Sequence, residues 1–155
     1  MLPHPLHPAL VHLPLGLAII LPLLILIVSI GISKQWFNKG VWVLIVGLQL
    51  ICMASGILSI ETGEDEEATV QKVLAGELIA KHEDMAKAFT VCAGITFASA
   101  LIGFIFIRKK KVFSLCSLAT LLLSLATLGL AMQTGHLGGK LVYEHGAAKA
   151  YEPAP

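Results

Sequence analysis

Four long apolar runs constrain this chain more than any other feature of its sequence. They cover about residues 8–32, 41–60, 86–107 and 112–132, and Lys87 is the one formal charge inside them. A helix of about 20 mainly apolar residues crosses the hydrocarbon core of a bilayer. A soluble domain of this size could not bury so many apolar side chains, because most of its residues would lie near water. The runs therefore predict an all-α integral membrane protein with four spanning helices.

Small residues predict how these helices pack. Glycine, alanine and serine recur in the second and third runs, and small side chains let helix backbones approach closely where lipid provides no hydrophobic drive to associate. Pro14 and Pro22 lie inside the first run and should bend its helix. We expect one compact four-helix bundle over residues 1–146, followed by a flexible outer tail over residues 147–155.

The charged residues separate into two groups, which predict an orientation in the membrane. The turns after the first and third runs are short and basic, with Lys34 and Lys39 in one and residues 108–111 in the other. All ten acidic residues fall on the opposite side. Because basic turns stay in the cytoplasm, we expect a multi-pass protein of the bacterial inner membrane. Both termini should face the outer, periplasmic or extracellular side.

The polar segment between the second and third runs is too charged to span the membrane. Val70, Val73, Leu74 and Leu78 recur in it at helical spacing, so it should form an amphipathic outer helix. Two placements fit this pattern. The segment either lies on the membrane surface or extends the third helix outward, with a break near Gly76.

Composition and motifs exclude several classes of function. A formal net charge of +1 argues against nucleic-acid binding, which needs a dominant basic face. The three cysteines lie inside apolar runs, and no C-x-x-C pair indicates zinc binding, thiol exchange or covalent haem attachment. The sequence has no glycine-rich phosphate loop and no recognisable serine nucleophile motif. These observations favour an electron-transfer or accessory subunit over a stand-alone enzyme.

The histidines are the candidate functional residues. All six lie outside the runs or at their outer ends: His4, His7, His12, His82, His136 and His145. At 1.5 Å per residue, His12 stands about 30 Å above the inner end of its helix, His82 about 37 Å and His136 about 36 Å. Three helices thus bring one histidine each to the outer hydrocarbon boundary. An ionisable side chain at that depth is costly to leave unpaired and marks a candidate functional site.

Three interpretations of these histidines stay open. Paired imidazoles on facing helices can bind a b-type haem, with apolar helix walls around the porphyrin. A zinc or copper ion would also take imidazole, and Glu61, Glu83 or Asp84 could complete its ligands. Alternatively, the histidines are interfacial hydrogen-bonding groups of a non-catalytic subunit that anchors or assembles a larger complex.

Three glycines, Gly135, Gly138 and Gly139, follow the fourth run. Glycine permits left-handed dihedrals and close backbone approach at the end of a helix. Two interpretations are open here. The glycines turn the chain back so that Tyr143 and His145 lie over the mouth of the bundle, or they end the helix and a surface loop follows.

Two motifs resemble those of a known family. They are HPALVHLP at residues 7–14 and TGHLGGKLVYEHG at residues 134–146. Together with His82 at the opening of the third helix, they resemble the bacterial membrane family catalogued as domain of unknown function 2231. The resemblance covers most of the chain. Such domains accompany redox modules, Rieske-type and cytochrome proteins among them, so the resemblance implies a redox role.

The leading functional hypothesis is an electron-transfer subunit with a histidine-bound haem b near the outer face. Matching depth pairs His12 with His82 as axial ligands of the haem iron. The resemblance adds His7 and His145, which would form a second pair or bond the haem propionates, and it gives His136 less weight. Quinol or a neighbouring redox protein would be the partner, and the subunit would work in the lipid bilayer as a homo- or hetero-oligomer.

Overall fold

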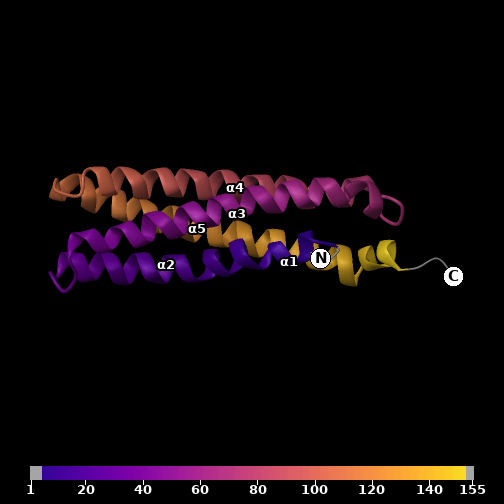
Figure 1. The fold of residues 1–155 in the computed structure, drawn as a ribbon, viewed down its shortest axis with the longest axis horizontal. Coiled ribbons are helices and arrows are strands. Elements are labelled where there is room, and N and C mark those ends of the chain that lie inside the picture. Colours follow the sequence, from indigo (N-terminus) through magenta and orange to yellow (C-terminus); the bar gives the residue numbers. More distant parts are fainter. Residues whose placement is uncertain (1–4, 153–155) are drawn as a thin grey trace.

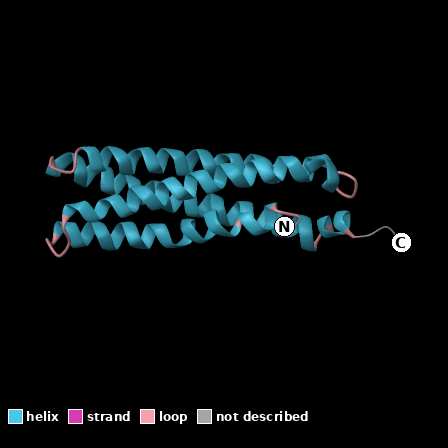
Figure 2. Ribbon diagram, viewed as in Figure 1, coloured by secondary structure: helices cyan, strands magenta, loops and turns pink. Residues whose placement is uncertain are grey.

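The computed structural model describes residues 5–152, and within that range the chain is entirely helical apart from turns (Figures 1 and 2). His4 lies outside the described residues. The elements are α1 (His7–Leu10), α2 (His12–Ser33), η1 (Lys39–Val41), α3 (Trp42–Val70), α4 (Gly76–Ile105), α5 (Lys110–Tyr143) and η2 (Ala147–Tyr151). Four helical stretches are long and apolar enough to cross a membrane. The predicted all-α membrane fold with four spanning helices is confirmed.

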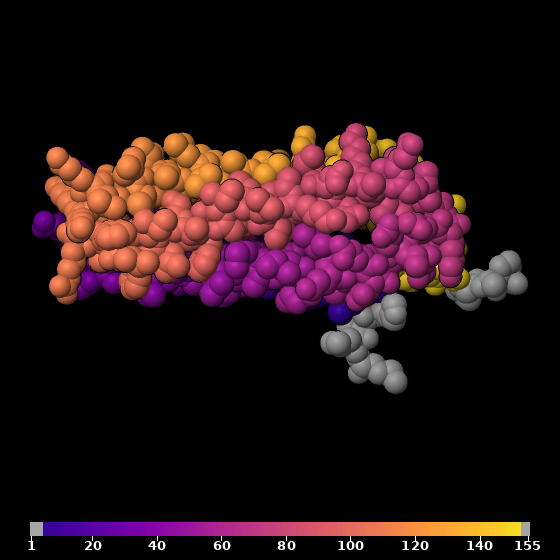
Figure 3. Space-filling view, turned by 90° about the horizontal axis from the view of Figure 1, so that it is seen from above, coloured from indigo at the N-terminus to yellow at the C-terminus, as the bar shows by residue number. Residues whose placement is uncertain are grey.

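The four long helices pack as an antiparallel ring. Helix α2 packs against α3 and α5, and α4 packs against the same two helices, so α3 and α5 face each other across the bundle (Figure 1). The bundle is elongated, with the turn between α4 and α5 at one end and the turn between α3 and α4 at the other (Figure 3). Since the helices alternate in direction, α1 and η2 lie towards the same end, opposite the basic turns.

Large apolar side chains lie mainly on the outside of the bundle, as a lipid-facing surface requires. Ile19, Leu23 and Leu115 are between 59% and 69% exposed, although each lies in the middle or at the start of a spanning helix. Trp42 is the largest fully buried side chain. Its Nε1 donates a hydrogen bond to the Ala100 carbonyl, which secures α3 to α4 near the basic end.

The interior between α4 and α5 is lined by small polar side chains. Thr96 and Thr127 are buried, and their hydroxyl oxygens lie 3.2 Å apart. Each hydroxyl also lies within hydrogen-bonding distance of a carbonyl one turn earlier in its own helix. Such bonds satisfy polar groups that lipid cannot solvate. The close helix packing predicted from the small residues is seen at Gly56, where an added Cβ would lie 2.9 Å from the Thr90 hydroxyl.

At the end of the bundle opposite the basic turns, the helices extend further than predicted. Helix α3 continues ten residues beyond the predicted end at residue 60, through the acidic run, to Val70. Helix α4 begins at Gly76 instead of residue 86. Glutamate and alanine are good helix formers, so the acidic run does not break α3. Residues 61–70 therefore continue α3 and residues 76–85 continue α4 away from the basic turns, and the break stands next to Gly76, as one of the two alternatives predicted.

The C-terminal end of the bundle also differs from the prediction. Helix α5 passes without a break through all three glycines to Tyr143, beyond the predicted end at residue 132. The left-handed turn lies instead at Gly146, whose φ is 74°. Residues 147–151, assigned to a flexible tail, form η2, in which Ala147 is buried. The glycines fail to end the helix because α5 is held on both sides by α2 and α4.

Candidate functional site

At the end of the bundle opposite the basic turns, two histidine rings lie close together in an edge-on, T-shaped arrangement. His7 begins α1, which packs against α3, and His82 lies near the start of α4. Their ring centres are 6.2 Å apart, and the ring planes meet at 86°. Both residues are half-buried. Ser59, whose carbonyl oxygen contacts His7, lies 17 residues beyond Trp42, or about 26 Å along the helix.

The backbone of α3 orients the His7 ring. Nδ1 of His7 lies 2.8 Å from the Ser59 carbonyl oxygen. A carbonyl oxygen only accepts hydrogen bonds, so neutral His7 carries its proton on Nδ1 and leaves the Nε2 lone pair free. Gly63 gives the ring its space, because a Cβ there would lie 3.2 Å from the ring carbon Cε1.

The ring of His82 has fewer polar contacts. It has a backbone hydrogen bond with Thr134 on α5. It also lies beside Gly138, where an added Cβ would lie 3.1 Å from its Cε1 atom. Its Nδ1 is buried and has no hydrogen-bond partner among residues 5–152. A buried polar atom without a partner is costly in a folded protein and calls for an explanation such as an unseen ligand or water.

Glu66 connects this site to both ends of the described chain. Its Oε1 accepts hydrogen bonds from the backbone N–H groups of Leu6, at 2.6 Å, and His7, at 3.1 Å. Its Oε2 accepts a hydrogen bond from the Tyr151 hydroxyl at 2.9 Å. Burial, together with the hydrogen bond to Glu66 and the charge of that carboxylate, raises the pKa of Tyr151 to about 12. One carboxylate thus holds α1 and η2 against α3.

The other predicted histidines are not part of this cluster. His12, His136 and His145 have exposed side chains. The structure brings the ring of His82 next to that of His7, whereas the pair proposed from depth is His12 with His82. The height of a residue along its helix does not show which side of the helix the residue occupies. At 3.6 residues per turn, the five residues from His7 to His12 turn the side chain by about 140°.

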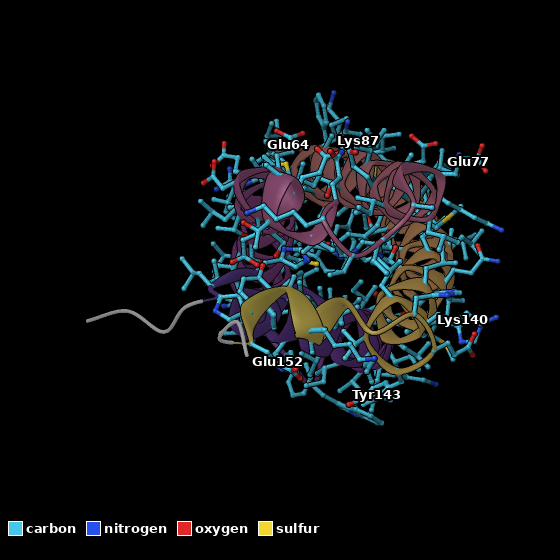
Figure 4. The ribbon with its side chains drawn as sticks, turned by 90° about the vertical axis from the view of Figure 1, so that its right-hand side faces the viewer. Glu64, Glu77, Lys87, Lys140, Tyr143 and Glu152 are labelled. Atoms are coloured by element: carbon cyan, nitrogen blue, oxygen red, sulfur yellow. The ribbon has the colours of Figure 1, made fainter. Side chains whose placement is uncertain are left out.

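The carboxylates considered as metal ligands have other positions. Glu83 forms an ion pair with Lys87, which also lies 3.9 Å from Glu64, and Glu61 and Asp84 are exposed. Figure 4 shows Glu64 and Lys87 together at the rim of the outer end. Across the described part of the chain, no group of three or more histidine, cysteine or acidic side chains is placed to hold a metal ion.

Sequence reasoning did not single out four residues of the site: Ser59, Gly63, Glu66 and Tyr151. Three of these lie on α3, at successive intervals of four and three residues, so they share one helix face. This spacing, in which Glu66 is the last residue and belongs to the acidic run, is the sequence signal that could have identified the site. Two other members of the acidic run, Glu64 and Asp65, are exposed.

The arrangement offers two adjacent imidazoles, one of which has its Nδ1 bonded to a carbonyl, among α1, α3, α4 and α5. Comparisons with curated proteins and with solved structures find no match to this chain. A family model described as "Predicted membrane protein (DUF2231)" matches residues 3–150. This match confirms the resemblance seen in the two motifs. The chain is a multi-pass membrane protein and belongs to the DUF2231 family.

Proposed function

We propose that this protein is an electron-transfer subunit that binds a b-type haem between His7 and His82. The close approach of the two rings, which come from different helices, carries this proposal. With about 2 Å for each bond between a metal and an imidazole nitrogen, two imidazoles on opposite sides of one metal have ring centres on the order of 6 Å apart. The separation of 6.2 Å between the two ring centres agrees with that geometry.

The donor set favours haem over a bare metal ion. Zinc and copper sites in proteins use three or four protein ligands, and the described residues offer no group of three. Haem iron needs only axial ligands from the protein, because the porphyrin supplies the other nitrogens. Two imidazoles are sufficient to bind a bis-histidine haem, but they are too few to form a zinc or copper site of this kind.

Features around the two rings also fit such a group. The Ser59 carbonyl binds Nδ1 of His7, the kind of hydrogen bond that orients metal-ligating histidines and leaves Nε2 as the donor atom. An added Cβ at Gly63 or Gly138 would lie within 3.2 Å of the neighbouring imidazole ring, so the two glycines keep this space open. The buried Nδ1 of His82 has no hydrogen-bond partner within the described part of the chain. When bound, haem supplies a one-electron couple, and the chain would hold it and exclude water.

The proposed orientation places this site at the outer face of a bacterial inner membrane. The basic turns around Lys34 and Lys109 lie at the end of the bundle opposite the histidine pair. By the positive-inside rule, that end faces the cytoplasm. A quinol in the outer leaflet or a redox protein at the outer surface would then be the electron partner.

A reduced-minus-oxidised difference spectrum of the purified protein, expressed with ample haem, tests this function. The wild type should show a low-spin bis-histidine haem, and His7→Ala and His82→Ala should each remove it. His12→Ala and His136→Ala, at exposed histidines, are the matched controls and should keep it. All four variants should insert, because the apolar spans are unchanged.

Two results would contradict the proposal in different ways. A wild type without haem would reject the cofactor, and metal analysis would then separate an ion-binding protein from an anchoring subunit. A haem lost in His12→Ala and kept in His7→Ala would reject the ligand pair and restore the one expected from depth.

A further inference from the structure

Glu66 is placed to determine the position of His7. The backbone N–H groups of Leu6 and His7 stand where the first helical segment begins, and N–H groups there have no carbonyl partner within the helix. Both donate to the same oxygen of Glu66. Hydrogen bonds to a charged acceptor are shorter and stronger than neutral ones. The carboxylate therefore fixes the backbone that carries the His7 ring.

The same face of α3 holds His7 at a second point. The Ser59 carbonyl binds the ring at Nδ1, and Glu66 binds the backbone two helical turns further out. Two attachment points on one rigid helix define both the location and the direction of a side chain. Without the outer attachment, the short α1 segment would keep only the ring contact and its packing.

Glu66 itself is held firmly. Its second oxygen accepts the Tyr151 hydroxyl, so neither oxygen is free to turn away. None of the ion pairs found over residues 5–152 includes Glu66. Three hydrogen-bond donors from two distant segments satisfy this charge where a lysine or arginine would usually do so.

We infer that Glu66 is the positioning residue of the histidine pair: it fixes His7 on α3 so that Nδ1 meets the Ser59 carbonyl and Nε2 is left as the free donor atom. The value of this arrangement for electron transfer rests on the proposed function. The positioning itself concerns His7 alone and is measurable in the protein without haem.

The test is the tautomer of His7, measured by ¹⁵N NMR of the full-length, haem-free protein in lipid nanodiscs. Wild type should show a single tautomer protonated at Nδ1. Glu66→Ala should replace it with the mixture of tautomers of a solvated imidazole. Glu66→Gln should restore the wild-type tautomer, because an amide oxygen still accepts from the two N–H groups. Glu64→Gln, at an exposed glutamate on the same helix, is the matched control and should leave it unchanged.

A wild-type tautomer in Glu66→Ala would overturn the inference. If that variant does not fold, Glu66→Gln decides alone through amide hydrogen exchange at Leu6 and His7. The neutral amide of Glu66→Gln should speed amide hydrogen exchange at these two residues by about fivefold, because hydrogen bonds to a charged acceptor are stronger than neutral ones. Unchanged exchange rates would overturn the inference. Failure of this test leaves the haem spectrum intact, whereas absence of haem leaves the tautomer intact, so the two proposals fail separately.

Discussion

Each histidine of the adjacent pair lies beside a glycine of a neighbouring helix. Gly63 on α3 borders His7, and Gly138 on α5 borders His82. In both cases the glycine lies inside a regular helix, where alanine would be the better helix former. The lack of a side chain at each glycine therefore leaves room for the neighbouring imidazole ring. The motif around Gly138 was visible in the sequence, but its role was not, because a role in packing depends on which helix lies opposite.

Replacing Gly138 by alanine should test this use of space. The new Cβ would lie 3.1 Å from Cε1 of His82, so the ring or the helix must shift, and such overpacking costs about 1–3 kcal/mol. Gly139→Ala is the control, since a Cβ there meets nothing within 4 Å. That control should gain up to about 1 kcal/mol from helix propensity. Unfolding of both variants in detergent measures the difference, and equal stabilities would show that the His82 ring moves without cost.

At the scale of elements, the sequence was informative about spans and weak about their ends. Apolar length is a property of the sequence alone, so four spanning helices could be predicted. The ends depend on contacts with other elements. Beyond residue 60, Glu66 on α3 binds the backbone of Leu6 and the hydroxyl of Tyr151. No local pattern predicts partners 60 and 85 residues away, so the docking of α1 and η2 on α3 was not predicted.

The docking of η2 should depend on Tyr151 and on high pH. Tyr151→Phe removes a hydrogen bond to a charged acceptor, worth about 1.5–3 kcal/mol, and should speed hydrogen exchange over residues 147–151. Tyr143→Phe is the control, because Tyr143 is 89% exposed. Folding raises the pKa of Tyr151 from its ordinary value near 10 to about 12. The stabilisation is therefore complete below pH 10 and is lost as the pH rises through about 12. Equal exchange in the two variants would show that packing alone holds η2.

For the whole molecule, the separation of charge along the bundle determines how it sits in the membrane. Glu64, Glu77 and Glu152 surround one end (Figure 4), and the residues 108–111 turn lies at the other. The histidine pair lies on the acidic side. Its candidate role as an outer-face site requires that side to be outside, and the basic turns at the other end predict this orientation. Orientation is therefore a prediction of its own, made from charge alone.

Reporter fusions measure this orientation directly. Fusions at Asn38 and after Lys110 should be active only with a cytoplasmic reporter, because those turns carry the basic residues that resist translocation. Fusions near Glu66 and after residue 152 should be active only with a periplasmic reporter. As a control, replacing residues 108–111 with neutral residues should weaken the preference, since that turn holds four of the six basic charges on its side. A cytoplasmic C-terminus would place His7 and His82 at the inner face, where a quinol or redox partner would have to approach from the cytoplasm.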